Sequence, residues 1–140
     1  MKKLIVIILL LPIMASSQNN VYYNSIGFEY TPFINNVCKY LGIKDHEIYI
    51  EWNKMPKHLH GVSYKTPQGM YVIYINIDSD RRKEALVHEL VHIKQDIDGR
   101  WDLRIPTTLM TRQGHKYING SENIEKEARL LSREIIKKIK

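Results

Sequence analysis

The chain has 140 residues, of which 44% are apolar and 26% are charged, with 7 Gly, 5 Pro and a single cysteine. This length suits one domain, and the composition excludes wholesale disorder, collagen-like repeats and a disulfide-stapled miniprotein. The formal charge is +6, from 21 basic and 15 acidic residues. Without Lys2 and Lys3, which belong to the segment discussed next, it is +4, which is too small and too scattered to indicate a nucleic-acid partner.

Residues 1–17 predict a secretory signal peptide. Lys2-Lys3 precedes an apolar run of 11 residues over positions 4–14, and the small residues Ala15-Ser16-Ser17 follow. We therefore expect cleavage after Ser17 and a secreted or periplasmic protein without a stable membrane anchor. The alternative is a retained anchor, but the run is shorter than the roughly 20 apolar residues that span a bilayer.

Residues 18–140 then form a single domain. Thr31-Pro32 begins a helical pattern that ends near Leu41-Gly42. Cys38 falls on the apolar face of this helix, so we expect it to be an inert core residue. Polar and apolar residues alternate over positions 46–52, which predicts a strand.

A β-hairpin and two further helices follow. Residues 61–65 and 70–77 flank Thr66-Pro67-Gln68-Gly69, a pattern typical of two strands joined by a tight turn. Asp78-Ser79-Asp80 offers N-caps for a helix that runs to about Ile97. Positions 100–120 are rich in breakers, and a last helix runs from Ser121 to the C-terminus. This order indicates an α+β domain with an antiparallel or mixed sheet.

The chemistry lies in the first of these two helices, which contains the HExxH pattern His88-Glu89-Leu90-Val91-His92. Residues four apart lie on the same helical face one turn apart, so His88 and His92 can bind one metal ion. Glu89 is rotated by about 100° from His88, close enough to exchange a proton with a water molecule beside the metal.

This pattern is specific, since residue frequencies give a chance match of roughly 0.02 per chain. Several apolar residues cover more than one side of the same helix: Leu86, Val87, Leu90, Val91, Ile93 and Ile97. Buried imidazoles and a carboxylate are costly without partners, which favours a metal site over two histidines satisfied within the core.

A catalytic zinc site needs a third protein ligand. Positions 95, 98 and 99 are Gln, Asp and Gly, so the metzincin continuation HExxHxxGxxH is absent. Acidic candidates begin the last helix: Glu122, Glu125 and Glu127. Helical geometry places Glu122 on the outer face, whereas Glu125 and Glu127 lie on opposite shoulders of the apolar stripe. Periodicity does not choose between these two.

The residues His88–Gln95 and Asn123–Ala128 resemble the gluzincin class of zinc metallopeptidases. The resemblance covers about residues 70–130 and implies a zincin-like fold. It further implies that Glu125, three residues before Ala128, is the third zinc ligand and that Glu127 supports a ligand. This chain departs from the class at the helix entrance, where relatives often have Pro-Trp.

The resemblance also implies an oxyanion-stabilising side chain, for which His115 and Tyr117 are the candidates. By analogy with the class, the strand over residues 70–77 is the edge that pairs with an extended peptide substrate.

We therefore expect an exported zinc metallopeptidase in which His88, His92 and Glu125 hold the metal and Glu89 is the general base. The main alternative is a zincin-like protein that binds a metal or a partner without turnover. Peptide deformylase ranks last, because Cys38 lacks the Glu-Gly-Cys-Leu context of that enzyme.

Overall fold

The computed structural model describes residues 21–23, 29–111 and 114–139. The predicted signal peptide, residues 1–17, lies outside this part of the chain. Within the described residues, no helix is both long and apolar enough to cross a membrane.

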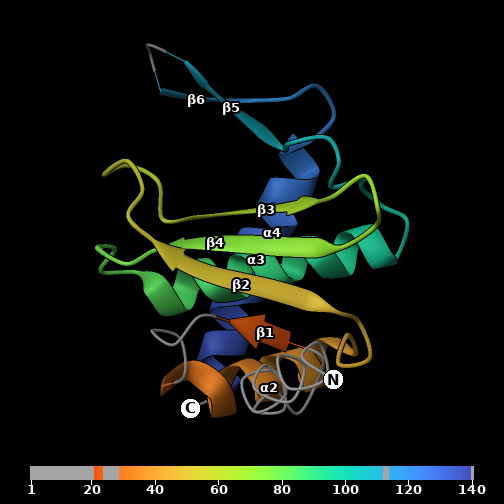
Figure 1. The fold of residues 1–140 in the computed structure, drawn as a ribbon. Helices are drawn as coiled ribbons and strands as arrows, with labels where there is room; N and C mark the ends of the chain where they lie inside the picture. Colours follow the sequence, from red (N-terminus) through yellow and green to blue (C-terminus); the bar gives the residue numbers. More distant parts are fainter. Residues whose placement is uncertain (1–20, 24–28, 112–113, 140) are drawn as a thin grey trace, which may run out of the picture.

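A mixed four-stranded sheet forms one layer of the molecule (Figure 1), in the order β1-β2-β4-β3. Its strands are β1 (Val21–Tyr23), β2 (Ile48–Asn53), β3 (Gly61–Lys65) and β4 (Tyr71–Asn76). The first three strands in this order run parallel, and β3 pairs antiparallel with β4 through the predicted turn. The mixed sheet and the hairpin confirm the prediction from the sequence, whereas strand β1 was not predicted.

The strand that provides the free edge differs from the prediction. Residues 70–77 were expected at the edge, but β4 pairs with β2 on one side and with β3 on the other. All residues of β4 except Tyr74 are buried, and a strand that is apolar on both faces belongs inside a sheet. The edge next to the HExxH helix is therefore β3.

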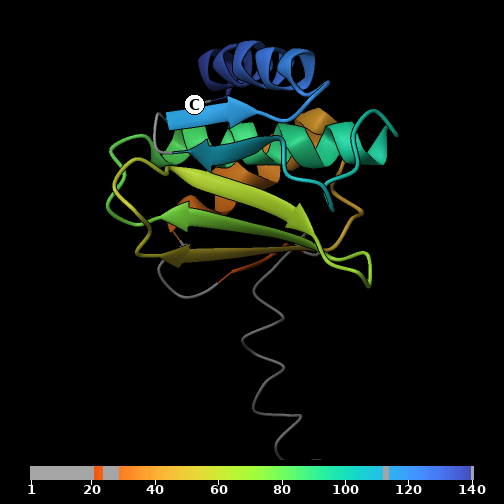
Figure 2. The same cartoon turned by 90° about the horizontal axis from the view of Figure 1, so that it is seen from above.

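Two helices stack in successive layers behind the sheet. Figure 2 shows α3 (Arg82–Ile97) against the sheet and α4 (Glu122–Lys138) beyond α3. Helix α3 is buried on nearly all sides, as predicted, and its C-cap is Asp98. The expected N-capping residues do not cap it. Ser79 Oγ instead accepts the N–H of Arg81 at 3.0 Å, just before the helix begins.

Helix α2 (Thr31–Leu41) completes the core beside α3 and ends where Gly42 adopts a left-handed φ of 70°. Cys38 is fully buried on this helix. Burial raises the pKa of its thiol to about 12, so Cys38 is a core residue, as expected, and is not positioned for chemistry.

The breaker-rich segment between α3 and α4 contains a second, smaller sheet. Strands β5 (Thr108–Thr111) and β6 (Gly114–Tyr117) pair antiparallel. This hairpin stands beyond the β3 edge of the main sheet in Figure 1. The α+β class is thus confirmed, and the HExxH helix packs between the four-stranded sheet and α4.

Candidate metal centre

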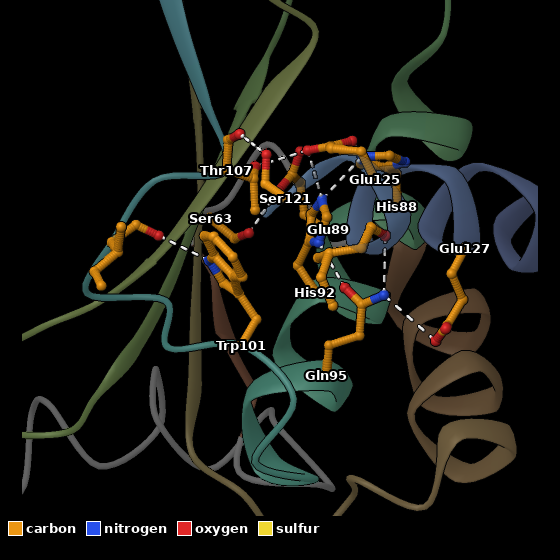
Figure 3. Close-up of polar contacts among 12 residues, drawn as sticks. Ser63, His88, Glu89, His92, Gln95, Trp101, Thr107, Ser121, Glu125 and Glu127 are labelled. Atoms are coloured by element: carbon orange, nitrogen blue, oxygen red, sulfur yellow. Dashed lines mark hydrogen bonds and ion pairs between the residues drawn. The ribbon is translucent and has the colours of Figure 1, made fainter. Parts of the chain in front are cut away.

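The two motif histidines meet on the face of α3 that is turned toward α4 (Figure 3). The Nε2 atoms of His88 and His92 are 3.0 Å apart. The His92 side chain is 3% exposed and that of His88 is 21% exposed. The four-residue spacing thus brings two imidazole nitrogens to one point that solvent can reach from the His88 side.

Glu125 joins them from the first turn of α4. Its Oε2 lies 3.1 Å from His88 Nε2, and its Oε1 lies 3.2 Å from His92 Nε2. The ligand atoms of these three residues all lie within 4.8 Å of one another. Of the two acidic residues that the periodicity left open, the structure brings Glu125 to the histidines.

The spacing of these three donor atoms fits a small divalent metal ion. Zinc–ligand bonds of about 2.0–2.2 Å in a tetrahedron separate the ligand atoms by roughly 3.3–3.5 Å. The observed separations of 3.0, 3.1 and 3.2 Å reach that range after shifts of a few tenths of an ångström. Two imidazoles and one carboxylate also form a donor set that zinc favours.

The protonation of His92 gives a second argument for a cation. Gln95 Nε2 donates to the backbone carbonyl of Ile124 at 3.0 Å, which fixes the orientation of the amide. Gln95 Oε1 therefore faces His92 Nδ1 at 2.8 Å, and this nitrogen must carry a proton. Neutral His92 then presents a lone pair at Nε2 toward His88 and the Glu125 carboxylate. A proton on His88 Nε2 can serve only one of these two acceptors, whereas a metal ion at this point binds both of them and His88 as well.

The other acidic candidate, Glu127, faces away from this point. Both of its carboxylate oxygens form a forked ion pair with Arg100. Glu127 Oε1 also accepts a long hydrogen bond of 3.4 Å from Gln95. Glu127 therefore contacts the residue that orients His92, consistent with the supporting position that the resemblance implied.

Glu125 is held by the loop that precedes β5. Thr107 Oγ1 donates to Glu125 Oε1 at 2.6 Å, and the fully buried Ser121 donates to the Thr107 carbonyl at 2.6 Å. Burial alone would raise the pKa of Glu125, but donation from Thr107 and, when they carry a proton at Nε2, from His88 and His92 outweighs it and holds that pKa well below its usual range. Burial would likewise lower the pKa of His92, but its carboxylate neighbours raise it.

Glu89 lies beside the histidines and is tied to the edge strand. Ser63 Oγ on β3 donates to Glu89 Oε2 at 2.5 Å, and both residues are buried. Gly61 allows this approach, because a Cβ at that position would lie 3.3 Å from Glu89 Cγ and 3.0 Å from Ile75 Cδ1. One carboxylate oxygen is thus fixed by Ser63.

A cleft of about 800 Å³ opens over these groups. Its walls come from the start of β3, the α3 face, residues 106–108 and the α4 face, and Tyr117 lines it as well. Tyr117 is 39% exposed and is part of the cleft lining. The side chain of His115, the other oxyanion candidate, lies outside the described part of the chain.

The segment before β3 forms one end of this cleft. The buried Asn76 organises it by donating to the carbonyl of Leu59 at 2.8 Å and by accepting the N–H of Asp78 at 3.1 Å. His60 Nδ1 lies 2.6 Å from Ser79 Oγ. His58, Leu59 and His60 all line the cleft.

Four supporting residues were not identified from the sequence: Ser63, Gln95, Thr107 and Ser121. A signal existed for Gln95, because a polar side chain in a helix that is buried all round requires a partner. Ser63 and Thr107 reach the site from segments that no motif spacing connects to α3.

Comparisons of the chain with protein-family models, with curated proteins and with solved structures found no match. Any assignment therefore depends on the site itself.

Proposed function

We propose that the protein is a zincin-like, zinc-dependent metallopeptidase of the gluzincin type. The observation that carries this proposal is the convergence of His88, His92 and Glu125 within 4.8 Å, with Glu89 beside them in the same cleft. Three protein ligands leave one position of a tetrahedron for water or substrate, which distinguishes a catalytic zinc site from a structural one.

Each residue has a role that follows from its position. Zinc, when bound, polarises the scissile carbonyl and acidifies a water molecule. Glu89, with Oε2 fixed by Ser63, uses Oε1 to accept the proton of the attacking water and returns it to the leaving nitrogen. Tyr117, at the rim of the cleft, donates to the negatively charged oxygen that develops on the carbonyl carbon.

The edge strand β3 provides a template for an extended peptide. The N–H of Asn76 donates to the His60 carbonyl at 3.0 Å, so pairing alternates from there and the backbone groups of Gly61 and Ser63 point away from β4. Both residues line the cleft. A substrate strand that pairs with them would pass directly over Glu89.

We further propose that the protein is exported, with residues 1–17 removed. This proposal depends on the signal-peptide pattern alone.

The test compares wild type with Glu89→Gln on the chain over residues 18–140. We expect about one zinc per chain in both proteins. We expect the wild type to hydrolyse members of a mixed peptide library, and Glu89→Gln to lose activity by about 10²–10⁴-fold. Glu134→Gln, on the exposed side of α4, is the matched control and should keep full activity.

The same experiment separates the alternative, a zincin-like protein that binds metal or a partner without turnover. Zinc bound by both proteins, with no cleavage by either, would select that alternative. The absence of zinc from the wild type after zinc is supplied would exclude both functions.

A further inference from the structure

The cleft carries an excess of positive charge next to the metal centre. Three arginines line it: Arg129 and Arg133 on α4, and Arg81 just before α3. Outside the metal centre and its general base, Glu84 is the acidic residue among the described residues of the lining. With neutral histidines, the part of the lining outside the metal centre and Glu89 therefore carries three positive charges and one negative charge, a net charge of about +2 at pH 7, and the carboxylates of Glu89 and Glu125 balance it until a divalent ion is bound.

These three arginines differ from the other arginines that the structure describes. Arg100 pairs with Glu127, Arg104 pairs with Asp102, and Arg82 donates to the Ile77 carbonyl at 3.2 Å. Among the described residues, no ion pair or side-chain hydrogen bond involves the guanidinium groups of Arg81, Arg129 or Arg133. The described arginines outside the cleft thus bind other groups of the protein, whereas the guanidinium N–H groups of those that line it are available to a ligand.

Arg129 and Arg133 also lie on the same face of α4 as the metal ligand Glu125. Arg129 follows Glu125 by one turn of α4 and Arg133 follows it by two, which places their Cα atoms about 6 Å and 12 Å along the helix axis from the ligand. Ser132 and Ile136 line the cleft beside them. One face of α4 therefore runs from the metal centre into a basic part of the same cleft.

We propose that this cleft selects peptides through a carboxylate bound by Arg129 and Arg133. This proposal rests on the proposed function. Because α4 crosses the direction of the strands (Figure 1), a peptide that pairs with β3 must leave this strand and follow α4 to reach the two arginines. An extended peptide advances about 3.3 Å per residue, so the carboxylate would then lie about two to four residues from the bond that is cut. Guanidinium groups bind carboxylates through paired hydrogen bonds. The carboxylate belongs either to an acidic side chain or to the C-terminus of the peptide.

The test measures peptide binding to the zinc-loaded Glu89→Gln variant, which does not consume its ligand. The probes are eight-residue neutral peptides in which one Glu, or Gln as its counterpart, is moved along the sequence. Each peptide is made with a free and with an amidated C-terminus. Fluorescence anisotropy gives the dissociation constants.

We expect the preferred carboxylate to tighten binding by about tenfold over its neutral counterpart. Adding R129Q/R133Q to the E89Q background should remove this preference, whereas R129K/R133K should restore part of it. The control K126Q/K137Q removes the same charge from α4 away from the cleft and should keep the preference. A preference for Glu in amidated peptides identifies a side chain, and a preference limited to free acids identifies the C-terminus.

Equal affinity for acidic and neutral peptides, or a preference that survives R129Q/R133Q, would overturn the proposal. Zinc content of one per chain in each variant confirms that the site is folded. A different result would contradict the proposed function: zinc-loaded wild type would cleave none of the peptides that Glu89→Gln binds.

Discussion

Two carboxylates, the buried Asp96 on α3 and the partly buried Glu125 that α4 brings to α3, have opposite surroundings. Asp96, near the end of the helix, accepts hydrogen bonds from Lys65 Nζ at 3.0 Å, from the Tyr71 hydroxyl at 2.8 Å and from the Leu103 N–H at 2.7 Å. Every neighbour in this set is a donor, and one of them carries a positive charge. Asp96 is therefore satisfied by the protein alone and joins β3, β4 and the loop after α3.

Glu125 lies in the opposite situation. It accepts one hydrogen bond from a hydroxyl group, that of Thr107, and its other neighbours are the imidazole nitrogens. Because Gln95 accepts the proton on His92 Nδ1, the Nε2 atom of neutral His92 carries a lone pair. This comparison teaches how a structural carboxylate differs from a ligand: the first is surrounded by donors, and the second lies next to another acceptor, His92 Nε2. A cation completes the second arrangement.

The largest effect that tests this comparison is the loss of zinc from Glu125→Gln. We expect zinc affinity to fall by roughly 1,000-fold or more, about 4 kcal/mol, because even the loss of an outer-shell partner costs about 10–100-fold. Competition with a chromogenic chelator measures the change. Glu127→Gln is the control and should weaken zinc by less than about tenfold. If Glu127→Gln caused the larger loss, Glu127 and not Glu125 would be the ligand.

Asp96→Ala should show the reverse pattern. Removing the acceptor leaves Lys65, the Tyr71 hydroxyl and the Leu103 N–H without it, and we expect the free energy of unfolding to fall by about 2–4 kcal/mol. Zinc content of the folded protein should not change.

The control is Asp98→Ala, which removes only a surface pair with Lys94 and should cost less than about 0.5 kcal/mol. Urea denaturation of the zinc-free proteins gives both numbers. Loss of zinc binding in folded Asp96→Ala would show that the two carboxylates are not independent.

Gln95→Ala tests the argument on the His92 proton. Without the amide, His92 Nδ1 loses its acceptor and the ring loses its fixed orientation, so we expect zinc to bind about 10–100-fold more weakly. Gln95→Glu keeps an acceptor at this position and should retain more of the affinity than Gln95→Ala. Equal affinity in wild type and Gln95→Ala would mean that the hydrogen bond does not position the ligand.

Features of the site that depend on local sequence were predicted, whereas features that depend on packing between distant segments were not. His88, Glu89 and His92 were predicted because one helix fixes their spacing. Glu125 and Glu127 remained open from periodicity, because the choice depends on how α4 packs against α3. Ser63, Thr107 and the edge position of β3 depend on long-range pairing, for which a single chain gives no local signal. The α3 and α4 helices and the β3–β4 hairpin were predicted, since hydrophobic period and turn residues act locally.

The smallest expected effect concerns alkaline pH at the Asp96 site. Burial and the hydrogen bond to Asp96 raise the pKa of Tyr71 above its usual value. The folded state therefore favours the neutral phenol, and its contribution to stability is complete below pH 10. It decreases as pH rises above the unfolded pKa of about 10, by about 1.4 kcal/mol up to pH 11. Urea denaturation at pH 9 and pH 11 should show a loss that is about 1.4 kcal/mol smaller in Tyr71→Phe than in wild type. The loss that remains comes from other groups, such as Tyr74, whose hydrogen bond with Tyr64 and burial raise its pKa to about 12. Asp96→Asn should keep part of the loss that Tyr71 causes, because burial is the larger cause. An identical loss in Tyr71→Phe and wild type would mean that other groups govern the alkaline limit.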